Sequence, residues 1–261
     1  MNRRIRLHRV ALRYGATPIL DGVDLDVASG EFVVVVGASG SGKTSLLRLA
    51  AGFVAADAGD VRLDDAPITG PGAERAVVFQ DDALFPWLDV RDNVAFPLRL
   101  RGDARDARRA AADAQLSAVG LDGYGSRRLW QLSGGQRQRV GLARALIVKP
   151  AFVLMDEPFA ALDALTRAQM QVALLQVWSQ HRQGVLFITH DIDEALLLAT
   201  KLVVLAGKPS RVAETIELDY ARRVLAGTPV RDVRADPAFQ QLRERVLDRL
   251  FDAAASPGAA P

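Results

Sequence analysis

The sequence predicts an α/β fold: a mostly parallel core sheet, an N-terminal antiparallel β-subdomain and an inserted helical subdomain. Three observations lead to this prediction. Apolar, strand-like runs alternate with helical segments along most of the chain, the run Phe32–Val36 leads directly into a glycine-rich loop, and about residues 81–130 are polar and helical in pattern with no strong strand. Because parallel strands need long crossovers that are usually helical, the alternation favours a parallel sheet.

The N-terminal half supplies several strands and the first helix. Residues 4–27 are typical of short strands, with turns expected at Tyr14-Gly15 and Asp21-Gly22. The run Phe32–Val36 is unbroken, which indicates a strand buried on both faces. Further core strands are expected at 77–79, 152–155, 185–188 and 202–205, and helices at about 43–51, 104–119, 136–147, 164–181 and 192–199.

The C-terminal part is expected to form one amphipathic helix and a tail. The helix begins at Asp236-Pro237, a capping residue followed by a proline at the first helical position, and it carries one apolar stripe. Residues 253–261 are rich in Ala, Pro and Gly, which predicts disorder. The globular domain is therefore placed at residues 4–250, with a helical subdomain at about 81–150 inside it.

Composition excludes several classes of function. The 33 basic and 31 acidic residues nearly balance and form no long basic run, so no nucleic-acid partner is expected. The chain has no cysteine, which excludes disulfides and thiol chemistry. The N-terminus shows no signal peptide, and the longest apolar runs are too short or too broken to cross a bilayer. We therefore expect a soluble protein whose membrane role, if it has one, depends on a partner.

The loop after the first core strand has the pattern of a phosphate-binding loop. Its sequence GASGSGKT matches G-x-x-x-x-G-K-[ST] at every fixed position. Backbone N–H groups of such a loop surround phosphate oxygens, the lysine reaches the β and γ phosphates, and the threonine hydroxyl is offered to Mg²⁺. The expected ATP-binding residues are Gly37, Ala38, Ser39, Gly40, Ser41, Gly42, Lys43 and Thr44.

Two carboxylates end the expected strand at 152–155. Asp156 and Glu157 follow it directly, at the sheet edge where ligands of parallel α/β folds bind. Asp156 is expected to hold the water shell of Mg²⁺, and Glu157 to polarise an attacking water. Alone, the pair could also be two incidental acids at a solvated strand end, so the nucleotide reading depends on the glycine-rich loop.

Three more side chains follow expected strands or turns and are candidates for the same site. Gln80 follows the strand at 77–79 and can contact Mg²⁺ or the attacking water, although alone it reads as a surface residue. His190 ends the strand Val185–Thr189, at the same sheet edge as Asp156, and can donate to the γ-phosphate. Tyr14 can stack on adenine, with an ordinary turn tyrosine as the alternative.

A second glycine turn lies about ninety residues beyond the first and contains no lysine. Ser133, Gly134, Gly135 and Gln136 run from a turn into an expected helix, whose N-terminus attracts anions. The residues alone leave open why one small domain carries two such loops.

These motifs occur in the order typical of the ABC transporter ATPases, and the chain resembles that family over about residues 4–250. The pentapeptide LSGGQ at 132–136 is the signature of the family, and the motif ALD at 161–163 completes the set. Ala160 departs from the usual Ser or Gly, which changes little because all three are small. Other stretches, including GPGAER at 70–75, VVFQDDALFPW at 77–87 and the C-terminal run from Arg211, resemble the importer ATPases for taurine and, more broadly, for sulfonates and nitrate.

The resemblance implies a head-to-tail homodimer that sandwiches two ATP molecules with Mg²⁺. It gives Glu157, His190, Lys43 and Gln80 catalytic roles, and Mg²⁺ contacts to Thr44, Gln80 and Asp156. The residues that face the partner's ATP are then Ser133, Gly134, Gly135 and Gln136, and Asp163 lies along the dimer seam.

The resemblance also implies a transmembrane permease on separate chains and a periplasmic solute-binding protein that delivers the solute. The ATPase would then lie at the cytoplasmic face of the bacterial inner membrane. An apolar group after Gln80, consisting of Leu84, Phe85 and Trp87, is the expected permease contact, with internal packing as the alternative. Taurine is the favoured solute; other sulfonates, nitrate or similar small anions are alternatives.

Other functions are less consistent with the chain. Soluble ABC ATPases usually carry two cassettes or a long coiled-coil insertion, and exporters commonly fuse the spanning domain to the ATPase. A non-catalytic binding module would not need Lys43, Asp156, Glu157 and His190 together.

Overall fold

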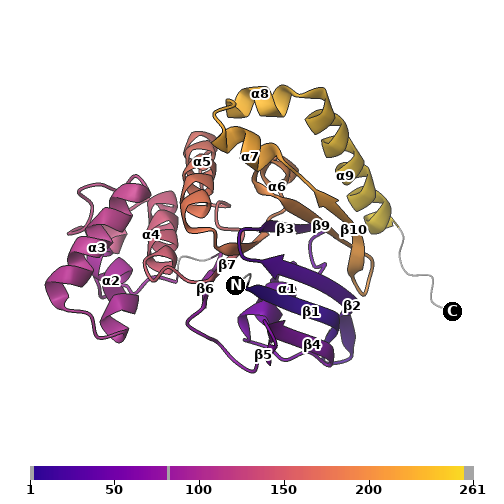
Figure 1. Ribbon diagram of the computed structural model, residues 1–261, viewed down its shortest axis with the longest axis horizontal. Coiled ribbons are helices and arrows are strands. Elements are labelled where there is room, and N and C mark those ends of the chain that lie inside the picture. Colours follow the sequence, from indigo (N-terminus) through magenta and orange to yellow (C-terminus); the bar gives the residue numbers. More distant parts are fainter. Residues whose placement is uncertain (1–2, 81–82, 256–261) are drawn as a thin grey trace.

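The chain forms two β-sheets with helices packed around them, in a computed structural model that describes residues 3–80 and 83–255 (Figure 1). The N-terminal sheet lies beside the central sheet, one helical group projects to the side, and the C-terminal helices arch over the far end. This is the predicted α/β architecture.

The central sheet has the strand order β10-β9-β3-β8-β7-β6. Five of its strands are parallel, and β10 joins the edge antiparallel to β9. Every residue of β3, β7 and β8 is buried, as expected for strands covered on both faces. The strands are β3 (Phe32–Gly37), β6 (Arg75–Val78), β7 (Phe152–Asp156), β8 (Gly184–Ile188), β9 (Lys201–Ala206) and β10 (Arg211–Glu217).

The N-terminal sheet is antiparallel and has the order β2-β1-β4-β5. Its inner face and helix α1 form one apolar cluster with one face of the central sheet, so α1 packs between the two sheets. The elements are β1 (Arg4–Tyr14), β2 (Thr17–Ala28), β4 (Ala58–Leu63), β5 (Ala66–Pro67) and α1 (Lys43–Ala51).

The predicted turn at Asp21-Gly22 is wrong. Both residues lie inside β2, where the pairing with β1 shifts register between Val10 and Leu12. An irregularity of this kind bends a strand without reversing it, so the glycine marks a bulge instead of a turn.

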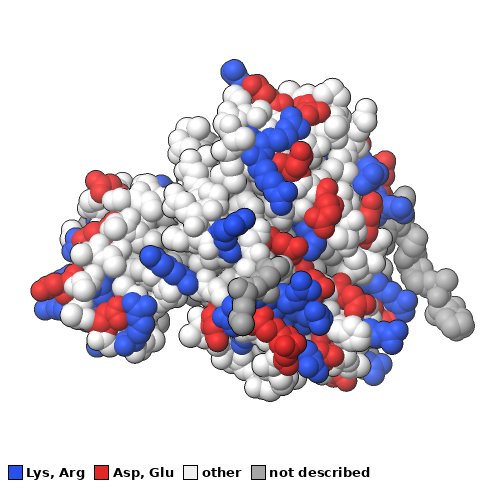
Figure 2. Space-filling model, in the orientation of Figure 1, with Lys and Arg blue, Asp and Glu red and all other residues white. Residues whose placement is uncertain are grey.

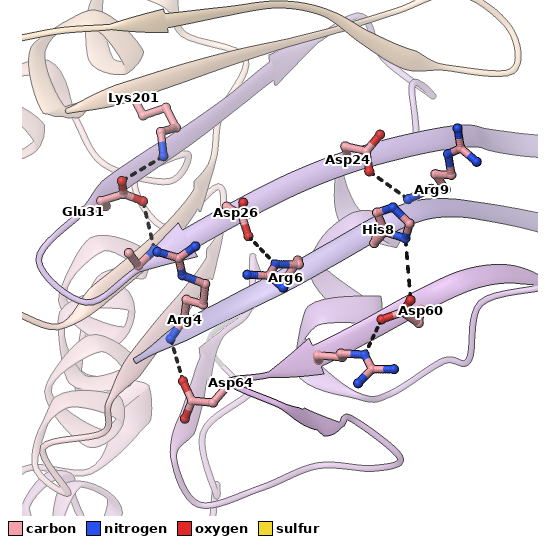
Figure 3. Close-up of polar contacts among 12 residues, drawn as sticks. Arg4, Arg6, His8, Arg9, Asp24, Asp26, Glu31, Asp60, Asp64 and Lys201 are labelled. Carbon is pink, nitrogen blue, oxygen red and sulfur yellow. Dashed lines mark hydrogen bonds and ion pairs between the residues drawn. The ribbon is translucent and has the colours of Figure 1, made fainter. Parts of the chain in front are cut away.

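The outer face of the N-terminal sheet carries cross-strand polar contacts (Figure 3). Arg6 pairs with Asp26 across β1 and β2 at 3.3 Å. Asp24 accepts a hydrogen bond from the backbone N–H of Arg9 at the shift in β1, at 2.9 Å. The alternation of apolar inner and charged outer residues holds this sheet in register.

The opposite face of the central sheet is covered by helices that belong to a second apolar cluster. The helices that follow β7 and β8 lie on this face, and the C-terminal helices pack against them (Figure 1). They are α5 (Ala164–His181), α6 (Ile192–Leu198), α7 (Tyr220–Leu225), α8 (Val230–Ala235) and α9 (Pro237–Ala255).

The helical group at the side contains the helices of the predicted subdomain. Its elements are α2 (Val90–Leu100), α3 (Arg105–Ala118), the short 3₁₀ helix η1 (Leu129–Gln131) and α4 (Gly134–Leu146) (Figure 1). Helix α2 lies in the segment expected to be helical, although no bounds were predicted for it. It contains Pro97, and Asp89 caps it by accepting from the backbone N–H of Asp92 at 2.6 Å.

Two further expectations need correction. Phe79 is not part of a core strand, since β6 ends at Val78 and the Phe79 side chain is exposed against Phe53. Residues 253–255 continue α9 instead of starting a disordered tail; the rest of that prediction, 256–261, lies outside the described residues.

Charges of both signs are interspersed over the face shown in Figure 2. Among the described residues, no helix combines the length and apolarity that a membrane span requires.

Candidate nucleotide-binding site

The glycine-rich loop connects β3 to α1 at the carboxyl edge of the central sheet. Gly42 precedes α1 with φ +82, and a Cβ there would lie 2.7 Å from Ile19 Cγ2, so this position requires glycine. Ser41 Oγ is buried and has no hydrogen-bond partner among the described residues. An orphaned hydroxyl in this loop fits a phosphate ligand.

Lys43 begins α1, and its side chain extends back into the loop that precedes it. Its Nζ donates to the carbonyl oxygens of Gly37 at 2.8 Å and Ala38 at 2.9 Å. Burial lowers the pKa of the ammonium group, and the nearby Glu157 and Asp156 partly offset this effect.

Asp156 ends β7 beside the start of α1, as the sequence predicts. Burial raises the pKa of its carboxyl group, while a hydrogen bond with the Thr44 side chain acts in the opposite direction. The Thr44 hydroxyl and the Asp156 carboxylate, both expected to contact Mg²⁺, are thus adjacent.

Glu157 and His190 meet where the neighbouring strands β7 and β8 end. The His190 Nδ1 atom lies 3.1 Å from a carboxylate oxygen of Glu157. Glu157 has a left-handed backbone with φ +45, held by a 2.9 Å hydrogen bond from its N–H to the carbonyl of Ile188. A strained conformation of a non-glycine residue is typical of functional sites.

A cavity of about 610 Å³ brings most of the predicted site together. It is lined by Ser39–Ser45 of the loop and α1, together with Tyr14, Ile19, Gln80, Glu157 and His190. Tyr14 is partly exposed at its rim, and its hydroxyl accepts a hydrogen bond from Ser45 Oγ at 3.3 Å. The backbone carbonyl of Gln80 accepts from Gln138 of α4 at 3.4 Å, which ties the cavity wall to the helical group.

The serine turn forms the N-terminus of α4 and does not line this cavity among the described residues. Ser133 Oγ accepts from the backbone N–H of Gln136 at 3.3 Å, and the Gln136 side chain accepts from the Ser133 N–H at 3.0 Å. This capping box preforms the helix end. Gly135 lies against the loop before α5, since a Cβ there would be 2.7 Å from Leu162 Cδ2.

Asp163 caps α5 and is exposed. Its carboxylate accepts from the backbone N–H of Thr166 at 3.0 Å, and this hydrogen bond lowers the pKa of Asp163. Arg167, one turn on, donates to the carbonyl of Leu162 at 3.1 Å and lies 3.4 Å from Asp191. The loop before α5 is thereby connected to the turn that carries His190.

The apolar group after Gln80 divides into an inner and an outer part. Leu84 is 9% exposed and packs in the core, which agrees with internal packing and not with a permease contact for this residue. Trp87, in contrast, is 70% exposed. Phe85 lies between them, with its ring centroid 5.5 Å from that of Trp87. The buried Asn93 binds this segment: its Oδ1 accepts from Phe85 N–H at 2.8 Å and its Nδ2 donates to the Phe85 carbonyl at 3.1 Å.

Sequence reasoning missed several residues that shape the site. Ile19 lines the cavity from the N-terminal sheet, and Ser45 positions Tyr14. Neither carries a motif, because each acts through the folding of distant segments. Arg167 follows Asp163 by one helical turn, and this spacing could have indicated that its side chain lies beside the start of α5.

Comparisons with known proteins agree with this geometry. The family model described as ABC transporter matches residues 20–160. The chain is 59% identical over 226 residues to the taurine import ATP-binding protein TauB of Sinorhizobium fredii, covering 87% of this chain and 85% of the relative. It is 55% identical over 249 residues to the protein of the same name from Pseudomonas putida, covering 95% of each.

Solved structures point to the same fold. A dimeric bacterial ABC transporter cassette matches with a TM-score of 0.74 and 29% identity, over 82% of this chain and 98% of the cassette. A dimeric ATP-binding cassette in a post-hydrolysis state, bound to ADP and Pi, matches with a TM-score of 0.73 and 28% identity over the same shares. The chain therefore belongs to the ABC transporter family, as an ATP-binding cassette.

Proposed function

We propose that the chain is the ATP-hydrolysing subunit of a bacterial importer for taurine. The observation that carries the hydrolytic part is the Glu157–His190 contact at the edge of a cavity walled by the phosphate loop. The solute is supported by relatives named for taurine import that are more than half identical to this chain over most of its length.

The site residues have distinct proposed roles in in-line attack of water on the terminal phosphate. Lys43 and the loop N–H groups bind the phosphates, Glu157 orients and polarises the water, and His190 donates toward the transferred phosphoryl group. Gln80 senses the same phosphate from the wall of the cavity, and Tyr14 stacks on the base. Positioning and charge stabilisation supply nearly all of the catalysis in such reactions.

The residues at the Thr44–Asp156 contact fit Mg²⁺. Among the described residues, no cluster of three His, Cys, Asp or Glu side chains forms a metal cage. Mg²⁺ in nucleotide sites is held by one or two protein oxygens together with phosphate oxygens and water, which matches Thr44, Asp156 and the amide of Gln80. When bound, the ion neutralises charge on the phosphates.

The serine turn is proposed to complete the site of a second copy. Ser133, Gly134, Gly135 and Gln136 lie outside the cavity of their own chain, and the Ser133 hydroxyl accepts from its own helix while its hydrogen remains available to an anion. ATP then bridges two chains in a homodimer, with Asp163 along the seam, and hydrolysis releases them. Both solved cassettes named above are dimeric.

Coupling to transport is proposed to run through a separate membrane permease. Phe85 and Trp87 present the apolar surface for a permease helix, while the neighbouring Leu84 is buried in the core. This places the chain at the cytoplasmic face of the inner membrane, with a periplasmic solute-binding protein on the other side.

Reconstitution tests the proposal. The chain, its permease and its binding protein are incorporated into vesicles with taurine, an alkanesulfonate or nitrate on the outside. Taurine is expected to stimulate ATP hydrolysis and to accumulate. Stimulation by nitrate or another sulfonate alone would reassign the solute, and a chain that binds ATP without releasing phosphate would reduce the proposal to a binding module.

A further inference from the structure

The turn that carries His190 is held on both sides by side chains that do not line the nucleotide cavity. Asp191, which follows it, caps α6 by accepting from the backbone N–H of Glu194 at 3.0 Å. The backbone N–H of Asp191 donates to the Thr189 hydroxyl, which precedes His190, also at 3.0 Å. The His190 side chain is largely exposed and contacts Glu157, so these flanking contacts fix the turn from which its ring projects.

Glu194 is the buried centre of this arrangement. Only 4% of its surface is exposed, yet its carboxyl group accepts hydrogen bonds from the Thr189 hydroxyl and, at 3.0 Å, from the Gln171 side chain of α5. A buried carboxyl is stable only where such partners compensate for lost hydration. Displacing Glu194 would therefore displace Thr189 and the turn with it.

Gln171 connects this carboxyl group to the C-terminal helices. It is 1% exposed, and its Oε1 accepts from the Arg234 guanidinium of α8 at 3.2 Å. Since a guanidinium only donates, Arg234 fixes the orientation of the amide and turns the Nε2 donors toward Glu194. The hydrogen bonds therefore run in one direction: Arg234 donates to Gln171, and Gln171 donates to Glu194.

A second contact joins α6 to the C-terminal helices. Arg243 of α9 lies 2.9 Å from Asp193, in the first turn of α6. Arg234 of α8 thus reaches α6 through Gln171, and Arg243 of α9 contacts α6 directly.

We infer that Arg234, Gln171 and Glu194 form a positioning relay through which the C-terminal helices hold His190 against Glu157. These three are positioning residues, because none of them lines the cavity. The inference rests on the proposed function, in which His190 acts on the terminal phosphate. It assigns the C-terminal helices a part in the rate of hydrolysis and none in the binding of the nucleotide.

The test compares Arg234→Met and Gln171→Met with matched controls in the purified full-length chain. Arg231→Met changes an exposed arginine of the same α8, and Gln176→Met changes an exposed glutamine of the same α5. We expect the relay variants to lower kcat about tenfold while KM for ATP changes less than about twofold, because small displacements of a catalytic group affect chemistry more than binding. The controls should keep wild-type kcat.

Nuclear magnetic resonance of the histidine rings gives a readout that does not depend on activity. The chain has three histidines, and His190→Ala assigns the His190 signal. Arg234→Met should move that signal and leave those of His8 and His181 in place. Unchanged kcat, an unmoved His190 signal, or an equal loss in the controls would overturn the relay. Wild-type turnover by His190→Ala would instead overturn the proposed role of His190, so the two failures are distinct.

Discussion

The His190 Nδ1 atom lies 3.1 Å from a Glu157 carboxylate oxygen, at the ends of two neighbouring parallel strands. This contact joins, within one chain, the carboxylate proposed to orient the water and the imidazole proposed to donate a hydrogen bond to the phosphate. The strained backbone of Glu157 shows that the fold holds the carboxylate at a defined place. Hydrolysis should therefore depend on the charge of Glu157 more than on the shape of its side chain.

Glu157→Gln tests that dependence. The amide keeps the shape but cannot act as a base, so we expect steady-state hydrolysis to fall by about 100-fold or more. ATP binding should persist, and the variant should accumulate as an ATP-bound dimer in size-exclusion chromatography. Glu217→Gln, at an exposed position of β10, is the control. Normal turnover by Glu157→Gln would remove this residue from the mechanism.

Ser133→Arg tests the contribution of the serine turn to a partner's site. The bulky cation should block approach of a second copy, so hydrolysis is expected to be lost while a monomer still binds ATP in a fluorescence titration. The Ser133 hydroxyl also caps α4, and its loss costs about 1 kcal/mol. Ser133→Thr keeps both the cap and the hydroxyl and should remain active. If Ser133→Arg hydrolyses ATP, the cross-dimer assignment fails.

Replacing Phe85 and Trp87 together by Ala tests the permease contact. Trp87 is 70% exposed, so its removal costs little packing, whereas Phe85 packs against Phe96 with ring centroids 4.4 Å apart. Basal hydrolysis by the isolated chain is expected to stay near the wild-type rate, while transport by the reconstituted importer is lost. Phe251→Ala, an exposed aromatic of α9, is the control. Unchanged co-purification with the permease and unchanged transport would refute the docking surface.

Asn93→Ala should disturb the same surface from beneath. The buried amide bonds both backbone groups of Phe85 and the carbonyl of Asp89. Its removal leaves the Phe85 N–H without this partner, while the carbonyls of Phe85 and Asp89 keep hydrogen bonds from the backbone N–H groups of Leu88 and Asn93. We therefore expect about 2 kcal/mol less stability in urea unfolding. Transport should fall more than basal hydrolysis. Wild-type stability would show that the segment does not depend on Asn93.

Replacing Glu194 by Gln should change how the stability of the fold depends on pH. Burial raises the pKa of Glu194 in the fold above its unfolded value of about 4.3. The folded state thus binds the proton more tightly, and the wild-type chain loses stability as pH rises from the unfolded pKa through the folded one. The amide lacks this loss, so the stability of the variant relative to wild type should increase in urea titrations as the pH rises above the unfolded pKa of about 4.3. A relative stability that is flat or falls with pH would contradict the prediction.

Local patterns predicted much of this molecule. The strand before the phosphate loop, the helix from Lys43 and the capped helix from Ala164 depend on neighbouring residues, and the structure has them at the expected places. The parallel order of the core also followed from the alternation of strands and helices. The cavity then unites the predicted Tyr14, Gln80, Glu157 and His190.

What the sequence did not predict depends on contacts between distant segments. The glycine at 22 reads as a turn locally, yet pairing with β1 continues the strand. Phe79 is apolar but lies beyond the buried part of its strand, against Phe53. Arg234 and Gln171 are 63 residues apart, and no local pattern in either segment indicates the other.

The two carbonyl hydrogen bonds of Lys43 have a consequence for discrimination between anions. The ammonium group has three N–H donors, and two of them are bonded to the carbonyls of Gly37 and Ala38. One donor is therefore left for an anion, while the two carbonyls keep the side chain in the loop. Chloride or a single phosphate would meet only this donor and the nearest N–H groups, whereas a triphosphate would also engage N–H groups further along the loop. We therefore expect this loop to bind small anions more weakly than a chain of phosphates.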